Sequence, residues 1–337
     1  MTPRVSVLIV NYNAGPHLLR CIAALRRQTV TDFEAIVVDN ASTDGSFALA
    51  RKSATGDPRF HWDDAGQNLG FAAGSNRAAR RARADWLATL NPDAFAAPDW
   101  LARLLDATAR YPDVDMFGST QFDARRPGML DGGGDAYLAA GVNWRGGYGR
   151  PAAERLPTCE VFAPCAAAAL YRSSAFRAAG GFDESFFCYC EDIDLGFRLR
   201  LMGARCVQLE DATVEHIGGG AGSSDAGFAR YHGVRNMIWT FVKNMPGPLI
   251  WLTAPAHIAA LAVHVSRAAV RGNFNPVRRG IQDAILGLPK ALSSRARIQR
   301  TRRATTFESA RALCWSPALY LRRGIHRLGP AERQAAR

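Results

Sequence analysis

The sequence lacks the glycine-rich motifs with which many enzymes hold phosphate groups. No G-x-G-x-x-G fingerprint follows a predicted strand, and no G-x-x-x-x-G-K-[ST] loop occurs in the chain. These absences exclude a dinucleotide-binding site of that type and a P-loop nucleotide hydrolase. If the protein binds a diphosphate, another group must neutralise the negative charge. A divalent cation would do so, because magnesium and manganese prefer carboxylate and phosphate oxygens.

The seven cysteines are too scattered to indicate a disulfide framework or a zinc site. Their number is odd, no Cys-x-x-Cys pair occurs, and Cys188 and Cys190 would point to opposite faces of a strand. We expect them to be small apolar core residues in a reducing compartment. The first residues also lack an apolar run long enough for a signal peptide, which agrees with this expectation.

Acidic residues are scarce near the end of the chain. From Arg267 onward there are 16 Lys and Arg against 3 Asp and Glu, whereas the rest of the chain has 26 against 27. A near-neutral body thus carries a basic tail, which predicts a polyanionic partner. Anionic lipid is favoured over nucleic acid, because no nucleic-acid-binding motif is present and few aromatic residues lie between the basic ones.

The first half of the chain alternates predicted strands with predicted helices. Residues 5–10, 33–39 and 86–90 are apolar runs of strand length, and Leu18 and Leu25 share one face of a helix between the first two. This β-α-β pattern predicts an α/β fold, with a mostly parallel sheet covered by helices on both faces. Ligands bind such sheets beyond the carboxyl ends of the strands.

Polar residues stand at those predicted strand ends. Tyr12, Asp39 and Asp93 each follow an apolar run. Asp93 belongs to an Asn-Pro-Asp sequence that could be a simple turn. Three polar residues at one sheet edge nevertheless favour a ligand site, with Asp93 as a candidate metal ligand. His216 ends a further predicted strand before a glycine loop, so it is either structural or a second ligand of the same metal.

The densest carboxylate cluster begins a predicted helix over residues 191–202. The helix dipole explains acidic residues there, and Asp194 can pair with Arg198 one turn later. These effects leave Glu191 and Asp192 beside several aromatic residues. A carboxylate near apolar rings and a like charge has a raised proton affinity, which suits a general base.

Two segments are rich in glycine. Residues 131–157 are either a mobile surface loop or a wall of a ligand site, with Tyr137, Trp144 or Tyr148 stacking on the ligand. Residues 217–224 follow His216 and are predicted to form a lid that closes over a bound ligand.

Residues 244–266 contain no acid, lysine or arginine and are nearly long enough to span a bilayer. Three prolines interrupt the segment, at Pro246, Pro248 and Pro255. From Pro255 onward the apolar residues share one helix face, and His257, His264 and Arg271 lie on another. This pattern predicts a helix in the membrane interface, next to the basic residues 295–303. Packing on the rest of the protein is the alternative, and whether residues 246–265 span the membrane or lie on it stays open.

Six segments, taken in order, resemble glycosyltransferase family 2 and in particular its bacterial rhamnosyltransferase-like members. They are VSVLIVNYN, VVDNASTDGS, NLGFAAGSN, LNPDA, GGFDESFFCYCEDIDLGFRLRLMG and EHIGG, and the resemblance covers residues 4–243. It implies a GT-A domain over residues 1–244. Residues 245–337 would then form a helical, basic, membrane-interface region. The metal motif keeps one carboxylate, and Pro164-Cys165 stands where the family often has glycine.

The resemblance also implies roles for individual residues. Asp192 would be the catalytic base, with Glu191 beside it, and Asp93 and His216 would hold Mg²⁺ or Mn²⁺. Nucleotide contacts would come from Val10, Tyr12, Asp39, Asn68, Gly70 and Asn91. Arg230 and Arg235 are expected to contact the donor phosphates. The acceptor would meet Trp144, Tyr148 and Tyr189.

The predicted activity is therefore an inverting glycosyl transfer. The expected donor is a nucleoside-diphosphate sugar, with dTDP-rhamnose favoured, and the expected acceptor is a lipid-linked bacterial surface glycan. The expected location is peripheral, at the cytoplasmic face of the inner membrane. One alternative is a catalytically silent nucleotide- or glycan-binding scaffold, which would not need the Glu191-Asp192 pair. A nucleic-acid-binding protein would leave the strand-end carboxylates unexplained.

Overall fold

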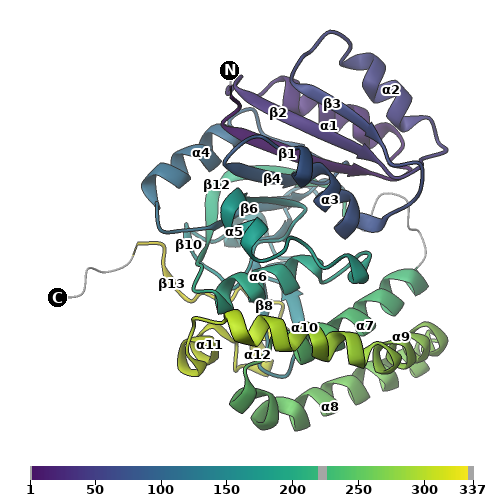
Figure 1. The fold of residues 1–337 in the computed structure, drawn as a ribbon, viewed down its shortest axis with the longest axis vertical. Helices are drawn as coiled ribbons and strands as arrows, with labels where there is room; N and C mark the ends of the chain where they lie inside the picture. The colour runs from purple at the N-terminus through teal and green to yellow at the C-terminus, as the bar shows by residue number, and fades with distance from the viewer. Residues whose placement is uncertain (1, 219–225, 333–337) are drawn as a thin grey trace.

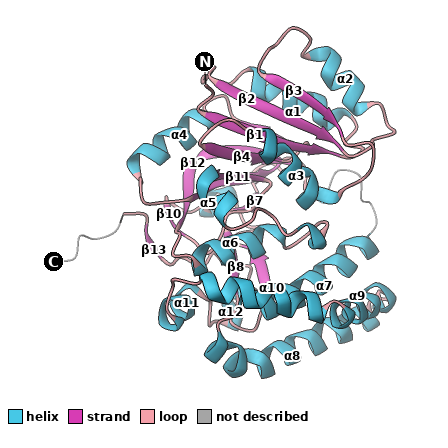
Figure 2. Ribbon diagram, viewed as in Figure 1, coloured by secondary structure: helices cyan, strands magenta, loops and turns pink. Residues whose placement is uncertain are grey.

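A mixed β-sheet runs through one half of the molecule, and its amino-terminal part is parallel (Figures 1 and 2). The computed structural model describes residues 2–218 and 226–332. Strand β1 pairs in parallel with β2 and β4, and β2 pairs in parallel with β3. These strands are β1 (Val5–Asn11), β2 (Phe33–Asp39), β3 (Phe60–Asp64) and β4 (Trp86–Leu90). Every residue of β1 and β2 is buried, because helices cover both faces of the sheet.

The second part of the sheet adds antiparallel strands, so the sheet is parallel only in its first part. Strand β11 lies antiparallel between β4 and β6, whereas β12 runs parallel to β6. The full order is β13-β10-β12-β6-β11-β4-β1-β2-β3, with β5 on β12 and β7 on β6. The added strands are β5 (Ala94–Ala96), β6 (Met116–Asp123), β7 (Leu130–Gly132), β10 (Cys159–Glu160), β11 (Ala168–Arg172), β12 (Cys206–His216) and β13 (Gly329–Pro330).

Helices cover the sheet in two sets, each with its own core. One face packs against α1 (Pro16–Arg26), α2 (Ser46–Ser53) and α4 (Trp100–Arg110). The other face packs against α3 (Gly70–Arg81), α5 (Ser173–Ala178) and α6 (Glu191–Leu201). Helix α6 begins at Glu191, as the sequence predicts, and its first turn lies beside the carboxyl ends of the strands.

The glycine-rich segment after β6 is largely buried structure rather than a mobile loop. It contains β7 and the hairpin of β8 (Asp135–Tyr137) with β9 (Asn143–Arg145). Tyr137 stacks on Phe162 and meets Phe197 edge-on in the core, so its ring is not available to a sugar. Asp131 and Asp135 are also buried. The surface-loop interpretation is therefore wrong for this part of the segment.

Helices α7 to α12 pack together on the opposite side of the molecule from the parallel strands (Figure 1). They are α7 (Ala226–Asn244), α8 (Gly247–Val270), α9 (Phe274–Leu286), α10 (Leu288–Thr301), α11 (Thr306–Ala312) and α12 (Pro317–Leu321). Two short 3₁₀ helices, Ala152–Glu154 and Glu184–Phe186, complete the description.

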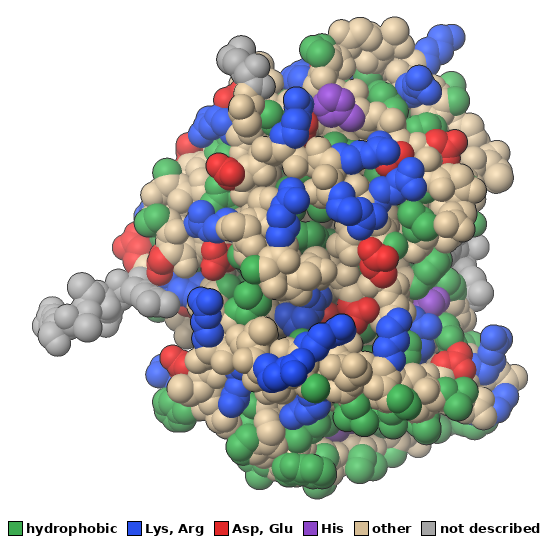
Figure 3. All heavy atoms as spheres, in the orientation of Figure 1, with side chains coloured by type: hydrophobic (Ala, Val, Ile, Leu, Met, Phe, Trp, Pro, Cys, Tyr) green, Lys and Arg blue, Asp and Glu red, His purple; other side chains and the backbone are tan. Residues whose placement is uncertain are grey.

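Helix α8 is continuous and exposes apolar side chains. Pro248 lies in its first turn and Pro255 inside it, so neither proline ends the helix. In the described part of the chain, it is the one helix long and apolar enough to cross a membrane, by length and composition. Trp251, Ile258 and Val263 are exposed, and Figure 3 shows hydrophobic side chains along the lower edge, where α8 lies in Figure 1. The polar face predicted from the sequence turns towards the protein: His257 is buried there.

A buried ion cluster joins α6 to α7. Lys243 Nζ lies 2.8 Å from Asp194 Oδ1 and 2.5 Å from Asp183 Oδ2, and Arg198 Nε lies 2.8 Å from Asp194 Oδ2. Burial opposes ionisation of both carboxyl groups. At Asp183 the positive charge of Lys243 outweighs the effect of burial, and the pKa of the carboxyl is lowered. At Asp194 the charges of Lys243 and Arg198 together do the same. The cluster therefore stabilises the contact between the sheet-packed helix and the carboxyl-terminal helices.

We expect Lys243→Ala to reduce the free energy of unfolding by about 3–5 kcal/mol at pH 7, because it leaves buried carboxylates without their partner. The pKa values of Asp183 and Asp194 are lowered on folding. Their stabilisation is thus present above the unfolded carboxyl pKa near about 4 and is lost as the pH falls below it. Urea unfolding at several pH values should show the gap to the wild type narrowing in acid. Lys290→Ala, at an exposed position on α10, is the control, and an equal loss in both variants would contradict the prediction.

Candidate active site

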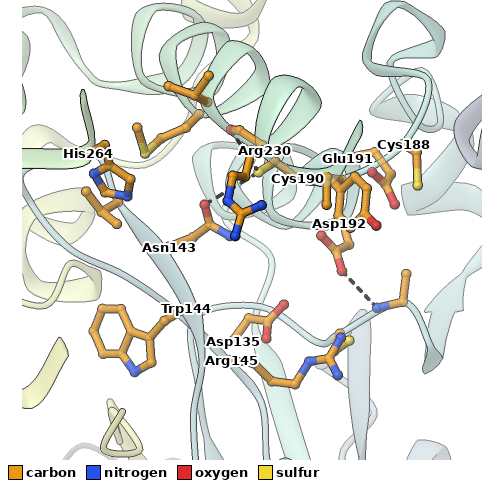
Figure 4. Close-up of a pocket in the computed structure, with 18 of the residues that line it drawn as sticks. Asp135, Asn143, Trp144, Arg145, Cys188, Cys190, Glu191, Asp192, Arg230 and His264 are labelled. Atoms are coloured by element: carbon orange, nitrogen blue, oxygen red, sulfur yellow. Dashed lines mark hydrogen bonds between the residues drawn. The ribbon is translucent and has the colours of Figure 1, made fainter. Parts of the chain in front are cut away.

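A cavity of about 700 Å³ opens where the carboxyl edge of the sheet meets α6, α7 and α8. Figure 4 shows Glu191 and Asp192 on one side of it, His264 and Trp144 on the other, and Arg230 between them. Three different parts of the chain thus supply its walls. They are the sheet with its β8–β9 hairpin, the first turn of α6, and the carboxyl-terminal helices.

Asp192 and Glu191 differ in their hydrogen bonds, although they are neighbours. Asp192 Oδ2 accepts from the Ala166 N–H at 3.1 Å, and Oδ1 accepts from the Ile193 N–H at 2.8 Å. Glu191 Oε2 is buried and has no hydrogen-bond partner among the described residues. Burial raises the pKa of both carboxyl groups, but the two N–H donors and the Arg145 charge counteract this at Asp192. Glu191 is therefore the one of the two that holds a proton more readily, and Asp192 is the better candidate for the carboxylate of the pair.

The turn that leads into α6 is strained. Phe187, Tyr189 and Cys190 all have positive φ angles, of 63°, 70° and 64°. Each such non-glycine residue costs on the order of 1–3 kcal/mol. Asn236 of α7 opposes this cost, because its Nδ2 lies 2.7–3.0 Å from three carbonyl oxygens of the turn. Helix α7 thereby fixes the position of Glu191 and Asp192.

Arg235 supports the same turn and does not reach the cavity. Its guanidinium donates to the carbonyl oxygens of Ser185 at 3.1 Å and Phe186 at 2.9 Å, and it lies over the Trp239 ring. The prediction that Arg235 contacts donor phosphates is therefore wrong. Arg230, one turn earlier on α7, does line the cavity.

Asp93 and His216 meet at the sheet edge. Strand β12 pairs with β5 so that His216 lies opposite Ala94, which brings His216 Nε2 to 3.3 Å from Asp93 Oδ1. Both Asp93 oxygens are buried and make no hydrogen bond within the described residues. On the other side of the ring, His216 Nδ1 lies 2.7 Å from Asp131 Oδ2. Burial lowers the pKa of His216, but the two carboxylates outweigh it and the pKa is raised. With its Nδ1 proton shared with Asp131, the ring would turn the Nε2 lone pair to Asp93, which would fit a divalent cation held by both residues.

Asp131 extends this contact towards the catalytic pair. It bonds to Arg145 of β9, and Arg145 lines the cavity near Asp192. The sequence pattern does not predict Asp131, Asp135 and Arg145 as site residues, because it favours a loop for the segment that carries them. The one sign of a site in this segment is that two acids and an arginine lie between glycines.

A second group of potential metal ligands lies in the cavity: Asp135, Cys165 and Asp192, whose ligand atoms are within 4.8 Å of one another. Burial raises the pKa of the Asp135 carboxyl well above its usual range, and it raises that of the Cys165 thiol as well. Both groups are therefore protonated. The group suits a hard cation less well than Asp93 and His216 do.

Comparison with known proteins decides the family. The model of glycosyl transferase family 2 matches residues 6–180, just over half of the chain. The chain belongs to glycosyl transferase family 2. It is 33% identical over 241 residues to an N-acetylglucosaminyl-diphospho-decaprenol L-rhamnosyltransferase of Mycobacterium tuberculosis, with 64% of this chain and 76% of the relative covered. It is 27% identical to an Escherichia coli chondroitin synthase over 60% of this chain and 27% of that one.

Solved structures confirm the GT-A fold of this glycosyltransferase. A mannosyltransferase from Pyrobaculum calidifontis, in complex with GDP-Man and Mn²⁺, superposes with a TM-score of 0.56 at 20% identity, covering 92% of this chain and 86% of that one. GalNAc-T7 with UDP, GalNAc and Mn²⁺ gives a TM-score of 0.57 at 15% identity, over 72% and 48% of the two chains. These similarities concern the fold.

The residues expected to contact the nucleotide gather at the carboxyl ends of β1 and β2. Asp39 Oδ1 accepts from Asn11 Nδ2 at 2.6 Å and is buried, whereas Tyr12 is partly exposed above it. Val10 packs beside α3, and Asn68 Oδ1 accepts from the Gly70 N–H at 3.0 Å. The glycosyltransferase thus brings the predicted nucleotide residues to one edge, and their roles stay predictions.

Gly70 connects this edge to the catalytic turn. Its φ of +77° is left-handed, and a Cβ there would lie 2.6 Å from the Phe187 carbonyl oxygen. A bulkier residue at position 70 would therefore displace the turn that carries Glu191 and Asp192.

Asn91, also predicted to bind nucleotide, lines the cavity and places Nδ2 3.4 Å from His216 Nε2.

The predicted acceptor residues separate into two groups. Trp144 and Tyr189 line the cavity. Tyr148 is not among the lining residues, and its ring lies beside the Arg126 and Arg323 guanidinium groups, of which Arg323 lines the cavity. The assignment of Tyr148 to an acceptor wall therefore stays a prediction. Most of the predicted lid, residues 219–224, lies outside the described residues.

We expect Asp192→Asn to reduce transfer by about 10²-fold or more while donor binding survives, because the variant keeps the shape and loses the proton acceptor. Glu191→Gln should cost much less, since Glu191 is already protonated. In the wild type the acid limb of kcat/KM should lie above the usual aspartate range, because burial raises the pKa of Asp192. Initial rates across pH, with thermal shift for donor binding, would test this. Near-normal turnover of Asp192→Asn would assign the base elsewhere.

We expect Asp131→Asn to weaken Mn²⁺-dependent donor binding by about 10- to 100-fold, because the carboxylate orients the His216 ring. Asp93→Ala should abolish that dependence while the protein stays folded. Thermal shift with donor across a Mn²⁺ titration measures both effects. Asp64→Asn, an exposed strand-end carboxylate at the edge of the sheet, serves as the control. Unchanged Mn²⁺ dependence in Asp93→Ala would contradict the metal assignment.

Proposed function

We propose that this glycosyltransferase transfers rhamnose, with inversion, from a nucleoside-diphosphate donor to a lipid-linked diphospho-sugar. The Asp192 carboxylate beside neutral Glu191 supports the chemistry, because one ionised base faces the cavity. The rhamnosyltransferase relative, whose acceptor is a diphospho-decaprenol-linked sugar by its name, supports the substrates. dTDP-rhamnose is the donor we favour.

The proposed reaction is a single displacement. The acceptor hydroxyl attacks the anomeric carbon in line, and Asp192 takes the hydroxyl proton. The new C–O bond forms as the bond to the departing diphosphate breaks on the opposite face, so the configuration inverts. A divalent cation held by Asp93 and His216 would supply positive charge to the diphosphate. Arg230 also lines the cavity and can add a second positive charge.

The catalytically silent scaffold receives no support from the site. A protein that only binds nucleotide would not need a strained turn, a braced carboxylate and a protonated neighbour at the floor of a cavity. Strain of this kind persists where surrounding contacts enforce it for a function. The Asn236 contacts to the turn are such an enforcement.

Transfer assays with a panel of nucleotide sugars test the proposal. The acceptor is N-acetylglucosamine linked by diphosphate to a short prenyl chain, and the product is analysed by NMR for anomeric configuration. We expect rhamnose to be transferred from dTDP-rhamnose with inversion, and Asp192→Asn is the inactive control. Transfer of another sugar would correct the donor. Donor binding without turnover on any acceptor would favour the scaffold.

We also propose that the protein is peripheral, at the cytoplasmic face of the membrane. The exposed apolar side chains of α8 and the basic charge after it supply the two signals that stable anchoring requires. The proposed division at residue 244 places the whole of α8 in this membrane region.

Anionic liposomes should therefore float the full chain, and binding should weaken as salt rises. The paired change Trp251→Ser and Ile258→Ser should reduce flotation, because both side chains are exposed on α8 (80% and 66%). Leu49→Ser, which removes a similarly exposed side chain (61%) from α2, is the matched control. Extraction by detergent alone, insensitive to salt, would favour a membrane span.

A further inference from the structure

We propose that Arg267 and Arg271 of α8, together with Arg323, bind the diphosphate of the lipid-linked acceptor. This inference rests on the proposed function, because it names how that acceptor is recognised. The donor diphosphate would be neutralised elsewhere, at Asp93 and His216.

Helix α8 presents one face to the cavity. His264, Arg267, Ala268 and Arg271 all line it, at the three- and four-residue spacing that places side chains on one side of a helix. Arg323, just after α12, lines the same cavity. The sequence alone predicts that the basic tail is a surface for anionic lipid in general. The structure turns these three arginines to the cavity and leaves others, such as Arg278 and Arg300, outside it.

These arginines have no acidic partner within residues 2–218 and 226–332. The arginines that this fold buries are neutralised: Arg198 pairs with Asp194 and Arg205 pairs with Asp113 and Glu160. Arg267, Arg271 and Arg323 are instead exposed at the cavity. No ion pair involves Arg267, Arg271 or Arg323 among the described residues; Arg323 contacts the Tyr148 ring instead. Like charges gathered at a cavity wall raise the local concentration of an anion. Guanidinium groups bind phosphate oxygens in paired hydrogen bonds.

The acidic side chains that line the cavity and the arginines of α8 lie in different parts of it. The carboxylates that line it are Asp135, Glu191 and Asp192. Figure 4 shows Glu191 and Asp192 on the side away from His264, with Asp135 near the middle. His264 belongs to the same face of α8 as Arg267. An acceptor that extends across the cavity would therefore have its reacting hydroxyl at Asp192 and an anionic group at α8.

The outer face of α8 explains why this anion belongs to a lipid-linked acceptor. Ile258, Val263 and Val270 are exposed there (66%, 46% and 88%). The helix thus offers arginines to the cavity and apolar side chains to the outside within three turns. A lipid-linked diphospho-sugar has the matching order: a sugar, a diphosphate, then an apolar chain.

Kinetics with two acceptors test the inference. One acceptor is the prenyl-diphospho-sugar, and the other is an aryl glycoside of the same sugar without phosphate. We expect the paired change Arg267→Ala and Arg271→Ala to raise KM for the first by at least about tenfold, since charge-assisted contacts are lost. KM for the aryl glycoside and for the donor should not change. The paired change Arg278→Ala and Arg300→Ala removes equal charge from α9 and α10 and should leave all three constants unaltered.

A binding measurement keeps the inference separate from the proposed function. Farnesyl diphosphate should bind the wild-type protein at least about tenfold more tightly than farnesol does, and the Arg267, Arg271 variant should lose this preference. This result would support the site even if rhamnose is not the transferred sugar. Equal binding of the two probes to the wild type would overturn it, whether or not the variant folds. So would a rise in donor KM, or equal effects in the control variant.

Discussion

A chain of polar contacts from Asp93 through His216 and Asp131 to Arg145 holds the active site together. Each link joins a different part of the fold, namely the turn after β4, the end of β12, β7 and the β8–β9 hairpin. The last residue of this series of contacts, Arg145, lies near Asp192. The candidate metal ligands and the candidate base are therefore positioned by one connected set of side chains. A shift at any link would move the candidate metal ligands relative to Asp192.

The carboxyl-terminal helices are part of this site. Asn236 of α7 braces the strained turn before α6, and Lys243 of the same helix pairs with Asp194 of α6. Helix α8 then closes the far side of the cavity. A boundary near residue 244 therefore describes a change in composition and exposure, while the cavity draws residues from both sides of it.

Sequence patterns predicted the parts of the site that lie in regular, local structure. Asp93, His216 and Asp192 follow strands or begin a helix, and the period of the apolar residues locates such positions. Asp131 and Arg145 were not predicted, because their short strands exist only through pairing and burial against distant segments. The prediction for Arg235 fails for a related reason. An arginine after a glycine loop, with no acidic partner nearby in the sequence, suggests a phosphate ligand. Only the tertiary structure shows that its guanidinium donates to backbone carbonyl oxygens instead.

Pro255 has a consequence for how deeply α8 can enter a bilayer. Proline has no N–H, so the carbonyl of Trp251 loses its helical donor. Both residues are exposed, and no neighbouring helix covers them within the described chain. In hydrocarbon that carbonyl would have no hydrogen-bond donor, which costs on the order of several kcal/mol for a buried polar group. At the level of the lipid head groups, water can satisfy it. In a membrane the proline would thus limit immersion, with the helix axis kept near the polar boundary and the cavity mouth within reach of water.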